Sequence, residues 1–536
     1  MKFETVRAGV AGVLAGLALL ASPQLAHADW LKAESERFIV YSEGSERSLR
    51  DYVHKLEMFD RVMQHRFGIP ISTVPPRKLP IYLVNGRSGL TRINPDSGRD
   101  TVGTYFPTEE DIFAAAVRRD DTGLSGEQVL MHEYAHHFML GATPAAYPAW
   151  YVEGFAEYYM TANIKISENS VFLGEYNQNR AYWILAENWI PLDILLRSRP
   201  GDVRIESQRA TYYPIAWLLT HWFYSDATRL EQLNAYLTDI GTGTDSVEAM
   251  ERATGMSLNE IRAALRRYTR VRLNGRRITG QFPTPDIVVT RLPRSANDLL
   301  LINQRLKIGV PDKDRAALGQ EVARLAARYG DDPLALLAAG HAGMHFGDRP
   351  AGERALQRLL EIEPENVEAL QFLAQERLRQ ARESDTPEER TPLRAQARDY
   401  LSRAYNVGSN DYRTLMLLTE LRQTQPNFPN DNDMLTMGLT LDRAPQLPAV
   451  RLNYASALAE KDEKGEAIAV LRPLANNPHG GRASKYAQRM IAALEAGDAL
   501  PQPQEGDDEP EIIEPEPEAP PPGDTPETPA PSESSN

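Results

Sequence analysis

The sequence contains no cysteine among its 536 residues. This absence excludes a disulfide framework, a thiol nucleophile, an iron–sulfur cluster and any zinc site built on cysteine. Any bound metal must therefore be held by histidine, aspartate or glutamate. The chain also lacks a surplus of positive charge, since 59 Lys and Arg residues stand against 74 Asp and Glu residues. Nucleic-acid binding needs a concentrated basic surface, so that class of partner is not expected.

Long hydrophobic runs are missing as well. A spanning helix needs ~20 apolar residues, and no such run follows residue 28. A shorter run, Ala8–Ala21, comes after Lys2 and Arg7 and before the small residues of Ala26–Ala28. A basic start, a short apolar stretch and a small-x-small site are typical of a secretory signal peptide. We therefore predict that residues 1–28 are removed and that the mature chain is periplasmic or secreted, without a transmembrane segment.

The C-terminal residues, 498–536, have little that could form a core. The part after residue 498 holds eleven prolines and eleven acidic residues but no Lys or Arg. Such a composition cannot bury enough apolar surface to offset the entropy lost on folding. A disordered acidic tail is predicted.

The first domain, residues 29–275, begins with the pattern of a small α/β lobe. Strands are expected at Phe38–Tyr41 and Leu79–Val84, and Ser48–Phe67 has helical spacing. Two more strands are expected on either side of a turn at 107–111. The second of these, within 112–117, is interpreted as an edge strand that an extended peptide could join. Helical patterns then dominate up to about residue 272.

The helical period breaks at residues 276–314, which we interpret as a linker to an all-α domain at residues 315–497. Units of about 34 residues that start at Pro333 and Pro448 resemble tetratricopeptide repeats. The first unit has residues of the expected size at its packing positions: Leu336, Gly340, Leu356, Leu359 and Pro364. Helical repeats form extended concave surfaces, so the resemblance implies a protein or peptide partner on this domain.

A metal-binding pattern lies in a predicted helix that begins near Ser125 and ends near Gly141. Within it, residues 132–136 read His-Glu-Tyr-Ala-His. Two histidines four residues apart share one helical face, so His132 and His136 can bind one zinc ion. Glu133 would then lie beside a water molecule on that ion.

A second helix, predicted to open at Pro148, carries Glu153 and Glu157. The sixteen residues between His136 and Glu153 are enough for a turn and an antiparallel return that brings Glu153 to the metal. Glu157 lies one turn later, where it can accept a hydrogen bond from a ligand imidazole and orient the ring. Three protein ligands leave the fourth zinc position to water.

Together these two motifs resemble the gluzincin metallopeptidases, which include thermolysin and the aminopeptidase N family. The resemblance covers about residues 125–225. It implies a zincin-like α+β domain in which His132, His136 and Glu153 bind Zn²⁺ and Glu133 is the general base. The Trp-x-x-Glu-Gly-x-Ala pattern that contains Glu153 is similar to the aminopeptidase pattern.

The sequence departs from known zinc-peptidase patterns at two places, and each departure limits what the resemblance implies. Met139 and Ala142 stand where a metzincin has glycine and histidine, which excludes that branch. No Gly-x-Met-Glu-Asn segment precedes the first helix, so recognition of a free substrate amine is not implied. An exopeptidase specificity is therefore not predicted.

Peptide hydrolysis also needs a donor for the oxyanion that develops on the carbonyl oxygen. Thr211–Trp217 is expected to open a later helix, with Tyr213 sixty residues after Glu153. A similar tyrosine, followed three positions later by a small residue, stabilises the oxyanion in the aminopeptidase family. Ala216 meets that spacing, so Tyr213 is preferred to Tyr212. An aromatic residue in core packing is the alternative.

The other histidines are expected to be structural. His137 points about 100° away from His136 on the helix, and His221 lies two turns beyond Tyr213. His341 and His345 have helical spacing but no glutamate in the motif position between them. The arginine-rich segment 262–277 is interpreted as a solvated helix end, with contact to the acidic tail or to anionic envelope polymers as the alternative.

The leading hypothesis from the sequence is an exported zinc metallopeptidase whose repeat domain binds protein or peptide substrates or a protein partner. The alternative is a non-catalytic envelope scaffold or chaperone that uses the repeat domain for protein–protein interaction. A third possibility combines weak peptidase and chaperone activity. The presence of all three ligands together with Glu133 favours the enzyme.

Overall fold

A computed structural model describes residues 29–504, apart from residues 71, 72, 74, 76, 100, 119–125, 143, 144, 272 and 274. The predicted signal peptide, residues 1–28, lies outside the described residues, as does the predicted acidic tail beyond residue 504. Both therefore stay predictions. No helix in the described part of the chain is long and apolar enough to cross a membrane.

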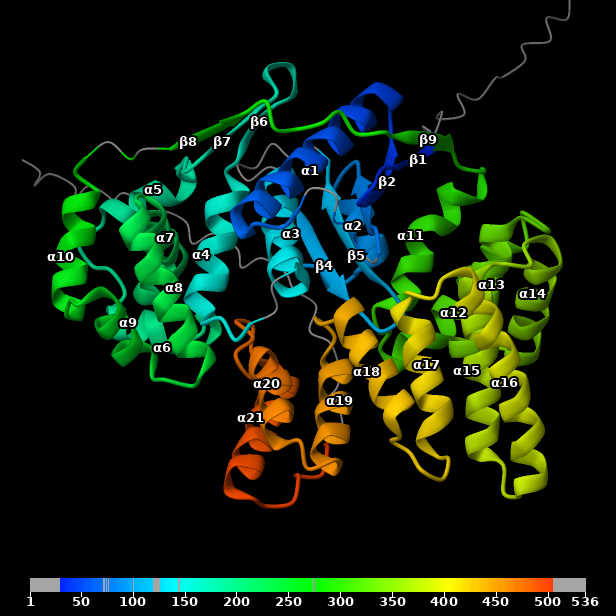
Figure 1. The fold of residues 1–536 in the computed structure, drawn as a ribbon. Helices are drawn as coiled ribbons and strands as arrows, with labels where there is room; N and C mark the ends of the chain where they lie inside the picture. The colour runs from blue at the N-terminus through cyan, green and yellow to red at the C-terminus, as the bar shows by residue number, and fades with distance from the viewer. Residues whose placement is uncertain are drawn as a thin grey trace, which may run out of the picture.

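A six-stranded mixed sheet, in the order β4-β5-β3-β2-β1-β9, lies at the centre of the N-terminal region (Figure 1). Its strands are β1 (Trp30–Glu34), β2 (Phe38–Glu43), β3 (Leu79–Val84), β4 (Gly103–Pro107), β5 (Ile112–Val117) and β9 (Val288–Arg291). The pairs β2–β3 and β3–β5 are parallel, and the other pairs are antiparallel. The strands expected from the sequence are all present.

The predicted edge strand is wrong. β5 lies inside the sheet, because it pairs with β3 on one side and with β4 on the other. The edge strand on this side of the sheet is β4, which was correctly expected as a strand but not at this place in the sheet order. A hydrophobic run shows that a strand is buried on its faces, whereas sheet order depends on pairing with distant strands.

Helices cover both faces of this sheet. The helices before the helical array are α1 (Glu46–Phe67), α2 (Arg87–Ile93), α3 (Gly126–Ala142), α4 (Ala149–Met160), α5 (Gln178–Leu185), α6 (Leu192–Arg197), α7 (Glu206–Tyr224), α8 (Ala227–Gly241), α9 (Ser246–Thr254), α10 (Leu258–Tyr268) and α11 (Ser295–Lys307). Side chains of β3 alternate between the faces, with Ile81 and Leu83 packed with α1 and α3, and Tyr82 and Val84 packed with α2 and α11. This double coverage explains the continuous apolar runs of β3 and β5.

The segment 276–314, interpreted from the sequence as a linker, contains regular structure. β8 (Arg276–Thr279) joins β6 (Asn163–Lys165) and β7 (Ser170–Leu173) in a small second sheet. β9 then completes the first sheet beside β1, and α11 covers one of its faces. The strands are too short to show a clear period between their glycines and prolines. We call the chain from β1 to β9, including the helices between these strands, the sheet domain.

The remaining chain is a curved array of helices, each packed on its neighbours in sequence. They are α12 (Asp312–Ala326), α13 (Pro333–Phe346), α14 (Arg349–Ile362), α15 (Val367–Glu383), α16 (Pro387–Val407), α17 (Tyr412–Gln423), α18 (Asp431–Arg443), α19 (Pro448–Glu460), α20 (Lys464–Ala475) and α21 (Gly481–Ala496). Gly340 is small because the Leu356 side chain of the next helix occupies the place of its Cβ. We call α12 to α21 the helical array.

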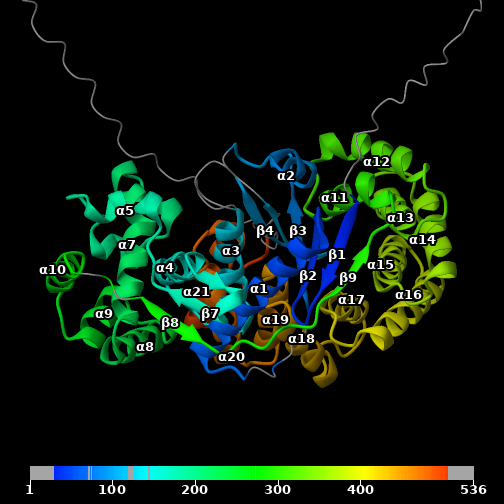
Figure 2. The same ribbon diagram turned by 90° about the horizontal axis from the view of Figure 1, so that it is seen from above.

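The helical array curves around the sheet domain, and α19 to α21 return beneath α3 and α4 (Figures 1 and 2). One contact is the β4–β5 turn, where Glu110 lies 2.8 Å from both His341 and His345 of α13. The Tyr412 hydroxyl of α17 donates to the Thr108 carbonyl of the same turn, at 3.1 Å. The two halves of the chain therefore form a continuous structure.

Candidate metal centre

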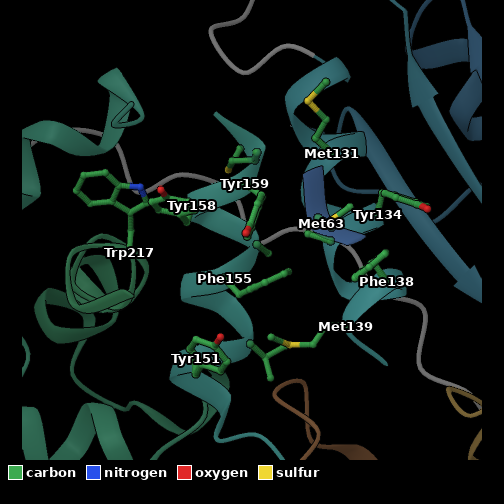
Figure 3. Close-up of a cluster of buried hydrophobic side chains, with 14 of the residues drawn as sticks. Met63, Met131, Tyr134, Phe138, Met139, Tyr151, Phe155, Tyr158, Tyr159 and Trp217 are labelled. Atoms are coloured by element: carbon green, nitrogen blue, oxygen red, sulfur yellow. The ribbon is translucent and has the colours of Figure 1, made fainter. Parts of the chain in front are cut away.

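Two buried helices position the centre. α3 and α4 lie side by side, and a layer of Met and aromatic side chains joins them (Figure 3). At the start of α4, the Trp150 indole donates a hydrogen bond to the Tyr236 hydroxyl at 2.8 Å, which fixes α4 to α8. Apolar contacts on several sides of each helix leave little freedom for the polar residues between them. The helices expected to start near Ser125 and Pro148 are therefore both present, although Ser125 itself lies outside the described residues.

The three predicted metal ligands meet between these helices. The Nε2 atoms of His132 and His136 are 3.0 Å apart. The Glu153 Oε2 atom lies 3.5 Å from the first and 3.6 Å from the second. All three side chains are buried. The structure thus brings together residues that are up to 21 positions apart in the sequence.

The donor set and its spacing fit a zinc ion. Nitrogen and oxygen ligands about 2.0–2.2 Å from a tetrahedral ion lie roughly 3.3 Å from one another. The three observed separations, 3.0, 3.5 and 3.6 Å, are close to this value. Both oxygens of Glu153 are buried and make no hydrogen bond within the described structure. A cation would compensate for that buried carboxylate.

Glu133 lies beside the ligands, buried, with neither of its carboxylate oxygens hydrogen-bonded to a described residue. Burial raises the pKa of Glu133 to about 8, and His132 opposes the rise. For Glu153, burial also acts to raise the pKa, but the neighbouring His136 and His132 rings hold it well below the usual range. Two neighbouring buried carboxyl groups are thus driven in opposite directions, which is typical of catalytic sites.

Glu157 lies next to the His132 ring, as the spacing predicts. Its Oε1 atom is 3.7 Å from Nδ1 of His132 and 3.1 Å from the Arg180 guanidinium. Arg180, on α5, also stacks over the Tyr213 ring at 4.8 Å. Arg180 therefore links the acid beside the metal ligand to the predicted catalytic tyrosine. No local pattern in the sequence indicated where this arginine would lie.

Tyr213 lies on α7, but not at its start. The helix begins at Glu206, and Pro214 is inside it rather than in the first turn. Proline favours the first turn of a helix, which is why the sequence suggested a later start. Tyr213 is 8% exposed, whereas Tyr212 is fully buried and donates its hydroxyl to the Ser198 carbonyl at 2.8 Å. The Tyr212 hydroxyl therefore has a structural partner.

A close approach of α4 and α7 brings these elements together. A Cβ on Gly154 would lie 2.5 Å from the Ala216 carbonyl oxygen and 2.3 Å from the Thr220 hydroxyl. Only glycine lets the two backbones come this close. The glycine after Glu153 and the small residue three positions after Tyr213 are thus the two sides of one contact.

A histidine of the helical array also reaches the centre. His479 lies between α20 and α21, and its Nε2 atom is 3.7 Å from the Glu153 Oε1 atom. Its ring centre is 6.0 Å from that of His136. Burial lowers the pKa of His479 to about 4, so the ring is neutral near pH 7. Sequence reasoning missed this residue, although a histidine between Pro478 and two glycines is an unusual loop residue.

The space around the centre is nearly filled. A cavity of only about 50 Å³ remains between Tyr105 of edge strand β4, His136 and the helical array. The array side is lined by the α18–α19 loop and by the loop that carries His479. Such a cavity accommodates a few water molecules but no peptide.

The other histidines have local partners. His137 Nδ1 is 2.8 Å from the Tyr105 hydroxyl, and His221 Nδ1 is 2.9 Å from the Tyr268 hydroxyl. His341 and His345 share the carboxylate of Glu110, at the distance of a direct hydrogen bond. That distance is shorter than the roughly 3.3 Å between two ligands of one zinc ion. We interpret this second group of possible ligands as a direct contact between the Glu110 carboxylate and two imidazoles.

The arginine-rich segment packs on its own domain. Arg266 stacks on Trp189 at 3.5 Å and donates to the Ala186 carbonyl at 2.6 Å. Arg277 pairs with Glu168 at 3.2 Å. The alternative, contact with the acidic tail, concerns residues outside the described part.

No family model and no curated protein sequence match this chain. Among solved structures, a thermophilic tetratricopeptide-repeat (TPR) protein from Thermus thermophilus is similar in part. The match covers 38% of this chain and 99% of that chain, with 16% identity and a TM-score of 0.31. A similarity of this size does not bear on function.

Proposed function

We propose that the protein is a zinc-dependent peptidase of gluzincin type that is exported to the periplasm or beyond. The observation that carries the proposal is the buried convergence of His132, His136 and Glu153, whose ligand atoms lie 3.0–3.6 Å apart. Glu133 stands beside them without a hydrogen-bond partner among the described residues. The carboxylates of Glu133 and Glu153 are buried without a hydrogen-bond partner among the described residues, which is costly unless a cation compensates for their desolvation.

Each residue has a defined part in this reaction. His132, His136 and Glu153 would hold a zinc ion, which would supply Lewis acidity and lower the pKa of a water molecule to about 7. The Glu133 carboxylate accepts the proton of the attacking water and passes it to the nitrogen of the leaving amine. Tyr213 would donate its hydroxyl hydrogen to the developing oxyanion, a role supported by the link from its ring through Arg180 to Glu157. Glu157 and Arg180 hold the His132 ring and the Tyr213 ring in place.

The first test counts zinc. We expect about one zinc ion per molecule in the full-length mature protein and a large loss of zinc in His136→Ala and Glu153→Ala. His137→Ala is the matched control, since His137 bonds Tyr105 rather than the metal. A wild-type protein that binds no zinc after reconstitution would contradict the proposal.

The second test separates zinc binding from catalysis. Glu133→Gln should keep the metal and lose peptide cleavage, measured with a fluorogenic peptide library. Loss of the general base typically costs 10²–10⁴-fold in rate. Activity that is unchanged in Glu133→Gln would show that the cleavage comes from a contaminant or from another mechanism.

The second candidate function is a protein-binding scaffold built on the helical array. It is favoured by the extent of the array, which runs from α12 to the last described helix and closes over the metal centre. In that case zinc would be a structural ion, and the protein would cleave no peptide even with the metal centre open to substrate. The helical array would then bind its partner equally well in wild type and Glu133→Gln.

A further inference from the structure

The loop between α20 and α21, residues 476–480, closes the metal centre from the helical array. Its tip residue His479 faces Glu153, with 3.7 Å between His479 Nε2 and the carboxylate. That nitrogen is buried and makes no hydrogen bond within the described structure. An unpaired ring nitrogen directed at a metal-ligand carboxylate is costly unless an ion lies between the two.

Hydrogen bonds to two separate parts of the sheet domain hold the loop in this position. The Asn476 side-chain amide donates to the Ala146 carbonyl at 3.3 Å, just before α4. From the sheet domain, Arg199 donates to the Ala475 carbonyl at 2.6 Å and to the Ser484 hydroxyl at 2.7 Å. Within the loop, the His479 amide donates to the Asn477 side chain at 2.9 Å. The position of the imidazole is therefore set by hydrogen bonds outside the metal centre.

The loop also occupies the place where a peptide would bind. β4 is the edge strand of the sheet on the side of the metal centre, and an extended substrate can add to such an edge as a further strand. The space beside Tyr105 of β4 and His136 is filled by Pro445, Gln446 and the loop, so only about 50 Å³ remains. A substrate can enter only if this part of the helical array moves away.

We propose that His479 is a fourth protein ligand of the zinc ion and that the structure is the latent form of the enzyme. The inference rests on the proposed function. Opening exchanges a neutral imidazole for a water molecule, without any change in proton or electron count. A protein partner that binds the helical array and draws α20 and α21 away from α4 would open the site.

The first test is the number of imidazoles on the metal, measured by zinc X-ray absorption of the full-length protein. We expect three imidazole ligands in wild type and two in His479→Ala. His65→Ala is the matched control, because His65 lies in the last turn of α1, outside the metal centre. It should keep three.

The second test measures how accessible the site is. We expect zinc removal by a soluble chelator to be at least 10-fold faster in His479→Ala than in wild type, and peptide cleavage to rise by a similar factor. Arg199→Ala should shift both rates in the same direction, because it releases the loop without touching the centre. Arg197→Ala is its control, since the Arg197 guanidinium pairs with Asp245 on the surface of the same domain.

The outcomes separate this inference from the proposed function. Wild type with zinc and two imidazoles, and no change in chelation rate in either loop variant, would overturn the role of His479 and leave the peptidase intact. Wild type without zinc would overturn the peptidase itself. If His479→Ala does not fold, the imidazole count of wild type and the chelation rate of Arg199→Ala still decide whether His479 binds the zinc ion.

Discussion

At the scale of single residues, the metal centre gathers charges that a folded chain would otherwise avoid. Glu133, Glu153 and Glu157 are each about 1% exposed and lie on two adjacent helices. Of these, Glu157 has the Arg180 guanidinium as a direct counterion. The groups that lower the pKa of Glu153 are neighbouring histidines. A divalent cation would supply the missing positive charge, which is why ligand identity can be argued from burial as well as from spacing.

Tyr213 gives a prediction at this scale. Tyr213→Phe should lower kcat by about 10²-fold, because one oxyanion donor is lost, while KM and zinc content stay close to wild type. Tyr212→Phe is the control: it removes the hydrogen bond to Ser198 and should cost about 1 kcal/mol of stability with little effect on kcat. Both are measured in the His479→Ala background by steady-state kinetics and thermal unfolding. Equal kcat values for Tyr213→Phe and its parent would assign Tyr213 to packing.

At the scale of elements, the contact between α4 and α7 depends on Gly154. Gly154→Ala places a methyl group against the Ala216 carbonyl and the Thr220 hydroxyl, so the helices must separate. We expect a loss of about 1–3 kcal/mol in the free energy of unfolding, the usual cost of overpacking. Zinc affinity should fall too, because Glu153 moves with α4.

The control for this variant is Gly141→Ala in the last turn of α3. A Cβ at Gly141 meets no atom within 4 Å. The change should therefore be neutral or stabilise the helix by up to about 1 kcal/mol. Chemical denaturation and competitive zinc titration of both variants measure the difference. A Gly154→Ala protein as stable as Gly141→Ala would contradict the close approach of α4 and α7.

The metal-ligand helices could be predicted because their signals are local. Capping and turn residues delimit α3 and α4, and the spacing of His132, His136 and Glu153 carries the geometry of the centre. Sheet order, the start of α7 and the role of segment 276–314 could not be predicted, since they depend on pairing and packing with distant residues. His479 is the extreme case, because it meets a residue 326 positions earlier in the chain. No hydrophobic periodicity in the sequence can indicate such a long-range contact.

At the scale of the whole molecule, the helical array is attached to the sheet domain near its start and at its end. Near its start, the β4–β5 turn enters an ion cluster in which Glu110 contacts α13 and lies 3.9 Å from Arg413 of α17. The neighbouring Asp111 lies 3.4 Å from Lys307 of α11. At its end, Arg199 holds the loop that carries His479. The proposed opening of the metal centre would therefore require release of the second attachment and of the α18–α19 loop, but not of the ion cluster around Glu110.

This arrangement predicts that Glu110 fixes the array without controlling the metal centre. Glu110→Gln should lower the free energy of unfolding at pH 7 by about 1–3 kcal/mol, because His341 and Arg413 lose a buried partner. Zinc content and the chelation rate should remain those of wild type. Glu46→Gln is the matched control: its ion pair with Arg50 lies on the surface and should contribute less than about 1 kcal/mol.

The pH dependence of this difference follows from the ionisation of Glu110. Burial acts to raise its pKa, but His341, His345 and Arg413 hold it well below the ordinary value of 4.5. Its contribution to stability is therefore fully present above pH 4.5. As the pH falls below that value, the unfolded chain takes up a proton that the native carboxylate does not, so the contribution is progressively lost. The part of the difference in unfolding free energy between wild type and Glu110→Gln that arises from the ionisation of Glu110 should thus shrink as the pH falls from about 5 toward about 3.5. Chemical denaturation across this range measures it, and a difference that stays constant or grows as the pH falls would contradict an ionised Glu110 in the native protein.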